Sequence, residues 1–568
     1  MDKIIGFSDD ELFGKILSFL PTKDAVSTSI LSKHWKFLWM RVPKLDFDEM
    51  SMYHDDSFSC QYILFEEDER RDFNNIKLGK SHMMRRFIHR NLPLHSSPVI
   101  KSLRLELFSD VFQPEDIKLW VEIAISHYVE ELSVKFSSFN GIPNASLPSS
   151  LYTCKSLVTL KLKYYDILVD VPHVCSLPSL KTLDLRRVIY ADKESLQRLL
   201  SCSSVLEDLV MDLCPFDNVR KFAVIIPSLL SLSFEISSMC TYDGYIIDTP
   251  SLKYFKAIDR SKRRTSTSTC VIVKNMPKLE EAYVRAGHNI KKLLQPVTSV
   301  KRLTLWVKDN KRAEAVYGDD IVFNKLEHLY FRACERFWSK LLFQLLNASP
   351  KLRDFTLNDH LTYDGYIMGG SVCWKQLNSV PQCLLSSLQT FKWLGYHRSV
   401  EGKDLVTYIL KNACLLKTAT ISAEQELETE VKNGFRGSPT CNLVFTEHWD
   451  DQSTLNSLSV AFADPSAKTG IRPLYIKLCL AGDSSLQLQL KVSLVKTGTT
   501  TDRIRTAVVF DVRSDGWRFH AMRSTGMNRS CLRCSVGWLE ISRHAQHRNE
   551  SEVASEATES GFWRGEGI

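Results

Sequence analysis

The 568-residue sequence has no apolar run that approaches the ~18 residues of a membrane-spanning helix. Its first ten residues contain no apolar core followed by small residues, the pattern of a secretory signal. The formal net charge is only +7, from 73 basic and 66 acidic residues, so charge alone gives no reason to expect nucleic-acid binding. We therefore expect a soluble protein of the cytoplasm, the nucleus or both, with no membrane partner.

Catalytic and metal-binding motifs are also missing. There is no Gly-rich phosphate loop, nucleophile elbow or metalloprotease histidine pair. Cys531 and Cys534 have zinc-knuckle spacing, but His544 and His547 lie closer together than a usual histidine pair, so coincidence is favoured over a zinc site. The 15 cysteines are scattered and odd in number, which predicts reduced thiols, many of them buried. The sequence thus predicts no catalytic residue, no metal and no cofactor.

The stretch 8–39 is rich in apolar residues at helical spacing. It predicts a first helix, capped by Ser8 and ended by Pro21, and a second helix capped by Thr22 with Asp24 in its first turn. Their apolar sides contain Leu12, Phe13, Ile16, Leu17, Leu20, Val26, Ile30, Leu31 and Trp35. Some thirty residues cannot bury this much apolar surface among themselves. The stretch must therefore pack on the rest of the chain or on a partner.

From residue 99 one short pattern recurs: apolar, two variable residues, apolar, one variable residue, apolar. Its copies are Ile100-Leu103-Leu105, Val129-Leu132-Val134, Leu157-Leu160-Leu162, Leu180-Leu183-Leu185, Leu206-Leu209-Met211, Leu229-Leu232-Phe234, Leu252-Phe255-Ala257, Leu279-Ala282-Val284, Val300-Leu303-Leu305, Leu326-Leu329-Phe331 and Leu352-Phe355-Leu357. The middle residues recur roughly every 21 to 29 positions, the period of leucine-rich repeats. The pattern predicts an irregular solenoid with parallel strands on its concave side and helices or loops, such as a helix at 194–200, outside.

Two further copies, Leu388-Phe391-Trp393 and Leu416-Ala419-Ile421, flank a predicted helix at 403–412 and would cap the solenoid. Beyond about residue 446 the chain is either a small β-rich domain, with candidate strands at 475–495 and 507–512, or sequence joined by a misdrawn gene model. Residues 550–568 are acidic and are predicted to be disordered.

Two polar stretches are rich in charged residues. The charge run 66–72 lies in a polar linker, where a solvated loop is expected, ahead of a helix at 83–92. A basic insert at 259–269 contains Arg260, Lys262, Arg263 and Arg264. An exposed loop between repeats is favoured for it over a phosphate-binding patch or a nuclear import signal.

The order of residues resembles a plant protein family. The runs 15–26 and 29–35, followed by Leu38-Trp39, closely resemble an F-box, with His34 where arginine is common. Residues 143–209 resemble the repeat segment of plant F-box proteins, and residues 373–421 resemble the FBD domain. The resemblance implies an α/β fold of the F-box/FBD/leucine-rich-repeat family. Its expected parts are a helical F-box at 1–48, a polar linker at 49–98, repeats at 99–365, an FBD domain at 366–445 and an unassigned, β-rich or disordered tail at 446–568.

An F-box is the module that docks on the Skp-type adaptor of cullin-based ubiquitin ligases. The resemblance therefore implies a non-catalytic, substrate-recruiting subunit of an SCF-type E3 ubiquitin ligase, which would bind the adaptor, and through it cullin, while its repeats bind a target protein. The adaptor-binding residues that it implies are Leu12, Ile16, Leu17, Leu20, Pro21, Val26, Ile30, Leu31 and Trp35. The alternative is a repeat-based binding or scaffold protein not coupled to ubiquitination. A nucleic-acid reader built from the basic insert and the Cys/His tail is disfavoured.

Overall fold

The computed structural model describes residues 9–52, 67–137, 145–164, 166–215, 217–240, 242–261, 270–286, 290–307, 321–333, 338–358, 374, 379–394, 400–422, 436–446, 506–513 and 516–523. The chain divides into two compact units, each described separately below. One unit comprises residues 1–47, 86–97 and 450–568, and the other comprises residues 48–85 and 98–449.

The first unit begins with the short helices expected from the sequence, although they differ in extent. Helix α1 (Asp9–Leu17) ends before Pro21, and the second predicted helix is divided into α2 (Thr22–Ser27) and the 3₁₀ helices η1 (Thr28–Ile30) and η2 (Trp35–Arg41), followed by strand β1 (Lys44–Asp48). Thr22 is not the N-cap as predicted, because that position is taken by Pro21. The Thr22 hydroxyl instead accepts the backbone N–H of Asp46 at 2.7 Å, which fixes the start of α2 to β1.

The region predicted as a polar linker is partly helical. Helix α3 (Glu67–Asn91) contains most of the charge run expected as a solvated loop, and the 3₁₀ helices η3 (Met50–Met52) and η4 (Leu92–Leu94) flank it. The buried carboxylate of Glu49 accepts the Ser81 hydroxyl and the Phe108 N–H, both at 2.5 Å. Arg85 donates to both oxygens of Asp116, at 2.6 and 3.2 Å. These contacts tie residues of the expected linker to the first repeats, because a buried carboxylate needs such donors.

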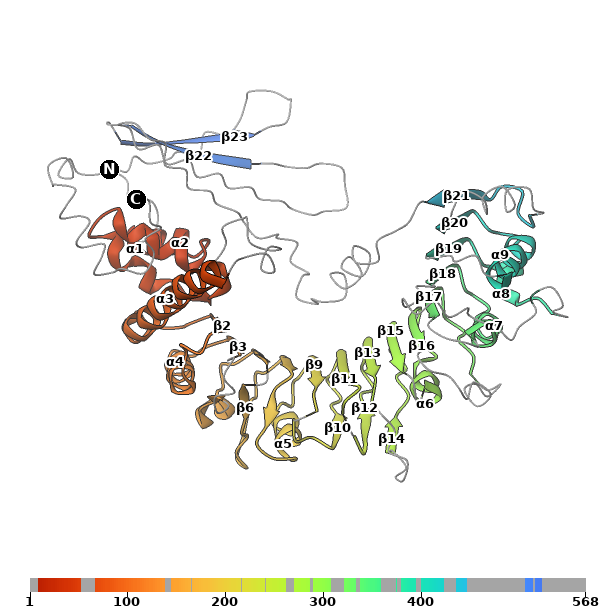
Figure 1. The fold of residues 1–568 in the computed structure, drawn as a ribbon, viewed down its shortest axis with the longest axis horizontal. Helices are drawn as coiled ribbons and strands as arrows, with labels where there is room; N and C mark the ends of the chain where they lie inside the picture. The colour runs from red at the N-terminus through yellow and green to blue at the C-terminus, as the bar shows by residue number, and fades with distance from the viewer. Residues whose placement is uncertain are drawn as a thin grey trace. The chain divides into compact units, whose positions relative to one another are not determined.

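The second unit is built on one long parallel sheet, as the repeat pattern predicted (Figure 1). Each strand lies beside the strand of the next repeat. The order is β2 (Ser102–Leu107), β3 (Glu131–Phe136), β5 (Thr159–Lys163), β7 (Thr182–Arg186), β9 (Asp208–Leu213), β11 (Ser231–Ile236), β13 (Tyr254–Asp259), β15 (Glu281–Ala286), β16 (Arg302–Val307), β17 (His328–Ala333), β18 (Asp354–Asn358), β19 (Thr390–Leu394), β20 (Thr418–Ser422) and β21 (Asn442–Thr446).

The middle apolar residue of each repeat is in register with that of the next. Leu103 pairs with Leu132, Leu132 with Leu160, and the series continues to Ala419 and Leu443. From Leu103 to Ala419 these residues are buried, because the last two apolar positions of each pattern point inward while the variable positions between them point outward. The stacked repeats therefore share one continuous core, as predicted.

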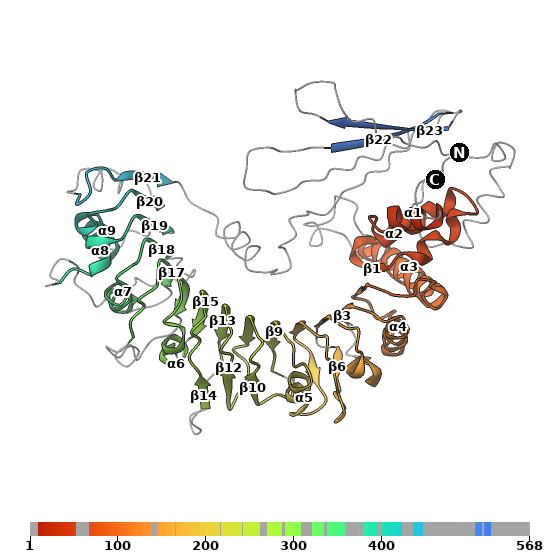
Figure 2. The ribbon, with the colours of Figure 1, turned by 180° about the vertical axis from the view of Figure 1, so that it is seen from behind.

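The outer side of the repeats holds both helices and strands. The helices are α4 (Pro114–Ser126), α5 (Ser195–Ser201), α6 (Ile290–Leu294), α7 (Trp338–Asn347), α8 (Gln382–Ser386) and α9 (Val400–Asn412), with 3₁₀ helices η5 (Ser149–Thr153) and η6 (Gln295–Val297). Two small parallel sheets were not predicted: β4 (Ala145–Ser146), β6 (Ile167–Val169) and β8 (Ile189–Tyr190), and β10 (Lys221–Ile225), β12 (Gly244–Asp248) and β14 (Cys270–Val273). Figure 2 shows this layering from behind, with the long sheet on the inner, concave side of the row of repeats.

Helices α5 and α9 confirm the predicted helices at 194–200 and 403–412 to within a few residues. In the tail, β22 (Thr506–Arg513) forms an antiparallel hairpin with β23 (Gly516–Arg523) and confirms the candidate strand at 507–512. The candidate strands at 475–495, the Cys/His group at 531–547 and the acidic end at 550–568 lie outside the described residues. Within the part of the chain that is described, no helix is both long enough and apolar enough to cross a membrane.

Candidate binding surfaces

The short helices of the first unit and the turns that join them carry large apolar side chains on their surface. Phe19 and Ile30 are each 65% exposed, Phe37 is 57% exposed, and Ile16 and Leu31 are each 42% exposed. These five residues are called here the exposed apolar surface. An isolated exposed leucine is ordinary on a protein, but this concentration in a segment of some twenty residues indicates an interaction surface.

A separate set of residues forms the core beneath. Leu17, Val26 and Trp39 are buried, and the Trp39 ring lies 5.3 Å from that of Phe87. The ring of Trp35 lies 4.9 Å from that of Phe13, and both residues are half-buried. Core or interface packing is expected of Trp35 and Trp39 in preference to a ligand-binding aromatic pair, and the burial of Trp39 agrees with it. These core residues pack the short helices together, while the side chains of the exposed apolar surface remain in contact with solvent.

The residues predicted to bind the adaptor fall into these two sets. Leu17 and Val26 are buried, and Leu20 and Trp35 are half-buried. The exposed ones are Ile16, Pro21, Ile30 and Leu31. The side chain of Leu12 lies outside those described. A role in contact with an adaptor therefore stays a prediction for the exposed members, and the buried members support the fold.

Sequence reasoning missed Phe19 and Phe37 as surface residues. Phe19 does not belong to the predicted apolar face of the first helix, and Phe37 follows Lys36 outside the apolar set of the second. The sequence does hold a signal that could have found them, because each is a large aromatic residue outside the apolar stripe predicted for its helix.

The concave face of the second unit carries a ladder of paired charges on strands β2 to β11. Glu106 bridges Arg104 and Lys135 at 2.7 and 2.8 Å. In the next repeats Asp184 bridges Lys163 and Arg186, at 3.3 and 2.8 Å. Because each carboxylate is nearly buried between two cations, the charges of this region are largely satisfied within the sheet.

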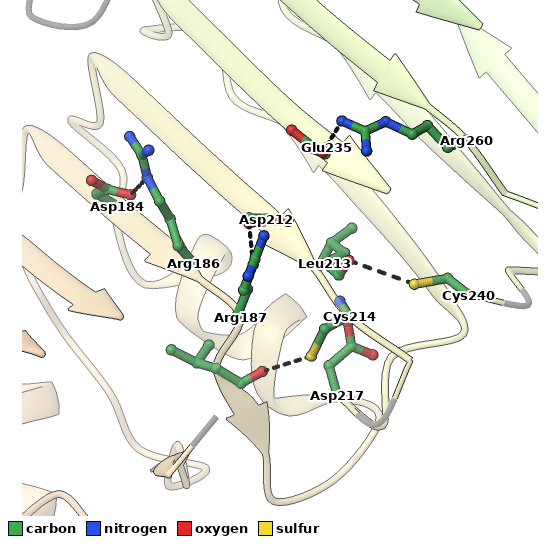
Figure 3. Close-up of polar contacts among 11 residues, drawn as sticks. Asp184, Arg186, Arg187, Asp212, Leu213, Cys214, Asp217, Glu235, Cys240 and Arg260 are labelled. Atoms are coloured by element: carbon green, nitrogen blue, oxygen red, sulfur yellow. Dashed lines mark hydrogen bonds and ion pairs between the residues drawn. The ribbon is translucent and has the colours of Figure 1, made fainter. Parts of the chain in front are cut away.

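The ladder continues across the following strands (Figure 3). Arg187 contacts Asp212 at 3.0 Å, and Arg260, the described residue of the basic insert, pairs with Glu235. Burial raises the pKa of Asp212, and the positive charge of Arg187 opposes that shift. Burial also lowers the pKa of Lys163, while the Asp184 carboxylate acts in the opposite direction. Residues 262–269 of the basic insert lie outside the described residues.

A buried carboxylate beside this ladder has a structural explanation. Asp217 accepts the backbone N–H groups of Cys214 and Val219, at 2.9 and 3.0 Å, and the Tyr242 hydroxyl at 2.7 Å. Burial raises the pKa of Asp217, and the three donors oppose that shift in part. The nearby thiols of Cys214 and Cys240 donate to the carbonyls of Val188 and Leu213 (Figure 3). All the donors around Asp217 and both thiols are thus engaged in holding the turn after β9.

Strands β13 to β19 present a different chemistry on the same face. The guanidinium carbon of Arg285 lies 3.3 Å from the centre of the Trp306 ring, and that of Arg332 lies 4.1 Å from it. Lys256 lies 5.4 Å from the Tyr283 ring. The Tyr330 hydroxyl accepts the Asn358 amide N–H at 2.6 Å. The residues Lys256, Tyr283, Arg285, Trp306, Tyr330 and Arg332 are called here the basic–aromatic face.

Among the described residues, no cluster of three or more His, Cys, Asp or Glu side chains has the arrangement of a metal site. Their cysteines with described side chains are free thiols, and Cys154, Cys214, Cys240, Cys383 and Cys441 are buried, in agreement with the predicted burial of many cysteines.

Comparison with known proteins gives three matches along the chain. A model of the F-box domain matches residues 9–47, one of the LRR repeats of the FBD-associated F-box protein At5g56370 matches residues 117–293, and one of the FBD domain matches residues 376–421. They confirm the resemblance found in the motifs.

Curated proteins of Arabidopsis thaliana are similar over most of the chain. The F-box/FBD/LRR-repeat protein At5g62970 is 59% identical over 456 residues, which cover 78% of this chain and all of that protein. The FBD-associated F-box protein At5g56410 is 62% identical over 440 residues, or 76% of this chain and 84% of that protein. The FBD-associated F-box protein At4g10400 is 43% identical over 453 residues, or 78% of this chain and all of that protein.

Proposed function

Because this chain belongs to the plant family of F-box/FBD/LRR-repeat proteins, we propose that it is the target-binding subunit of an SCF-type cullin-RING ubiquitin ligase. Its F-box binds a Skp-type adaptor, and its repeats bind the protein to be ubiquitinated. The chain carries out no chemistry of its own. It acts by holding the target near the ligase, which raises the effective concentration of the two reactants.

The exposed apolar surface is the observation that carries this proposal. Phe19, Ile30 and Phe37 are more than half exposed, while Leu17, Val26 and Trp39 of the same segment are buried. Burying one such side chain contributes about 1.5–3 kcal/mol. A partner that covers several of them would gain enough free energy for stable docking, and a helical adaptor supplies an apolar groove of this kind.

Two substitutions and a matched control test the adaptor contact. Phe19→Asp and Ile30→Asp each place a charge on the exposed apolar surface, and Val174→Asp makes the same change at a residue of the second unit that is 81% exposed. We expect Phe19→Asp and Ile30→Asp each to weaken adaptor binding about tenfold or more in isothermal titration, because a charge buried in an apolar contact is costly. Val174→Asp is expected to bind as the wild type does.

Thermal unfolding of the same variants shows whether the fold survives. All three side chains point into solvent, so the midpoint should change little. Adaptor binding by Phe19→Asp and Ile30→Asp at wild-type affinity would contradict the proposal. Capture of target proteins without adaptor or cullin would instead favour the scaffold alternative.

A further inference from the structure

Two cysteines, Cys175 and Cys202, lie together at the C-terminal end of helix α5. The Arg198 carbonyl accepts both the Cys175 thiol, at 3.5 Å, and the backbone N–H of Cys202, at 3.0 Å. The Cys202 thiol donates to the next carbonyl of the helix, that of Leu199, at 3.3 Å. The two sulfur atoms therefore lie against neighbouring carbonyls of one helical turn, and the two thiols are hydrogen-bonded to each other.

Further contacts hold the two segments in this position. The Leu177 N–H donates to the Cys202 carbonyl at 3.0 Å, which fixes the backbone two residues beyond Cys175 against the end of the helix. The Arg198 side chain donates to the Val171 carbonyl at 2.9 Å, which fixes the same segment on its other side. Because a disulfide forms only where the backbone already brings two cysteines together, this arrangement meets its first requirement.

The two thiols are also open to solvent in part. Of the eight cysteines with described side chains, five are buried and Cys414 is exposed, whereas Cys175 and Cys202 are half-buried. Val174, the residue before Cys175, is 81% exposed. A small oxidant can therefore approach the Cys175 thiol from solvent, as the modification of a cysteine requires.

The surroundings of Cys202 favour a disulfide over a thiolate. Burial raises the pKa of the Cys202 thiol, and its hydrogen bond with the Cys175 thiol acts in the same direction. The carbonyl groups at the C-terminal end of a helix disfavour negative charge as well. A pair of thiols that gains nothing from ionisation gives a disulfide that is hard to reduce, whereas a stabilised thiolate makes a disulfide labile.

We propose that Cys175 and Cys202 are an oxidative modification site, at which a small disulfide such as glutathione disulfide is reduced and the two cysteines become joined. The Cys175 sulfur loses its proton and attacks one sulfur of the small disulfide, which releases a first small thiol. The Cys202 sulfur then loses its proton and attacks the Cys175 sulfur of the mixed disulfide, which releases a second. The two protons end on the two small thiols, so two cysteines are oxidised as one small disulfide is reduced.

The new bond would close a loop that contains one complete repeat. Strands β7 and β8 and helix α5 all lie between Cys175 and Cys202 in the sequence. A cross-link restricts the unfolded chain, so the oxidised protein should unfold at a midpoint about 2 °C or more above that of the reduced protein. The F-box belongs to the other compact unit, and we expect oxidation to leave adaptor binding unchanged.

The test incubates the full chain at neutral pH with excess glutathione disulfide, blocks the remaining thiols with iodoacetamide and maps the cysteines by mass spectrometry. We expect peptides joined through Cys175 and Cys202, which separate after treatment with dithiothreitol. Iodoacetamide on both cysteines would overturn the proposal, as would glutathione that persists on Cys175 of the wild type or a bond from either residue to another cysteine. This map of the wild type decides the proposal even where a variant does not fold.

Three serine variants test the order of the two steps. Cys202→Ser removes the second sulfur, and we expect it to accumulate glutathione on Cys175. Cys175→Ser should leave Cys202 modified about tenfold more slowly, because that thiol is protonated at neutral pH. Cys414→Ser removes an exposed thiol elsewhere and is expected to form the bond as the wild type does. Equal rates of modification in Cys175→Ser and Cys202→Ser would contradict the order proposed.

Discussion

On strands β2 to β11 the charged side chains of the concave face pair with one another, whereas on β13 to β19 cations lie against aromatic rings. In the first region Asp184 is held between Lys163 and Arg186. In the second, Trp306 is held between Arg285 and Arg332. The backbone register is the same in both, so the difference comes only from the variable positions of the repeat. A carboxylate between two cations binds them by charge, whereas an indole between two cations binds them through contact with its ring.

The largest expected loss of stability comes from a substitution in the ladder of paired charges. Asp184→Ala should lower the free energy of unfolding by about 1–2 kcal/mol, because it leaves Lys163 and Arg186 without their shared carboxylate; the partly exposed Arg186 keeps the loss below that of a fully buried pair. Urea denaturation measures it. The control is Asp354→Ala, whose pair with His328 is exposed, and its loss should stay below about 0.5 kcal/mol. Equal losses would show that the ladder is no better satisfied than an ordinary surface pair.

The next effect is in the basic–aromatic face. Trp306→Ala removes both ring–guanidinium contacts, each of which contributes about 0.5–1 kcal/mol when partly exposed, so the loss should be about 1–2 kcal/mol. Trp306→Phe keeps a smaller ring and should lose less. Denaturation midpoints of the two variants check this order. If Phe and Ala are equally destabilising, the ring does not hold the arginines as described.

The smallest expected change in stability is at two lysines, Lys256 and Lys163, whose pKa values are both lowered by burial. Lys256→Met removes a half-buried charge that lies 5.4 Å from the Tyr283 ring, and should raise stability by about 0.5 kcal/mol. Lys163→Met also removes a half-buried charge, but the gain is offset because Asp184 loses a contact at 3.3 Å. The two thermal midpoints should therefore move apart, and identical shifts would contradict the contrast.

The direction in which stability depends on pH follows from the lowered pKa of Lys256. The pKa of Lys256 in the folded protein lies below its ordinary value of 10.5, so the unfolded chain binds more protons between those two values. The contribution of Lys256 to stability therefore rises with pH through that interval. The advantage of Lys256→Met should be greatest below it and shrink as pH approaches 10.5. An advantage that grows with pH would contradict burial as the cause.

The repeat strands could be predicted from the sequence because each pattern places two inward residues on one short strand. Leu232 and Phe255 show this, since both are fully buried and paired in register. The outer sheet of β4, β6 and β8 was missed because β4 and β8 contain only two residues each, too few for alternation to stand out. Tertiary stacking of successive repeats, not local pattern, decides those strands.

The two binding surfaces were predictable to different degrees. The F-box motif indicated residues that include both Leu17, which is buried, and Ile30, which is exposed, because a helical pattern does not say which apolar residue has a neighbour to pack on. The basic–aromatic face was not predicted, since Arg285, Trp306 and Arg332 lie far apart in sequence at variable positions. Once the repeats are aligned by their middle residues, these three fall in one row, and that alignment was the available signal.

Hydrogen–deuterium exchange of the full chain, with and without a Skp-type adaptor, tests the proposed function most directly. Binding on the exposed apolar surface predicts slower exchange in α1, α2 and η2 when the adaptor is present, and unchanged exchange in β15, β16 and β17. Unchanged exchange in α1, α2 and η2 at saturating adaptor would contradict the account.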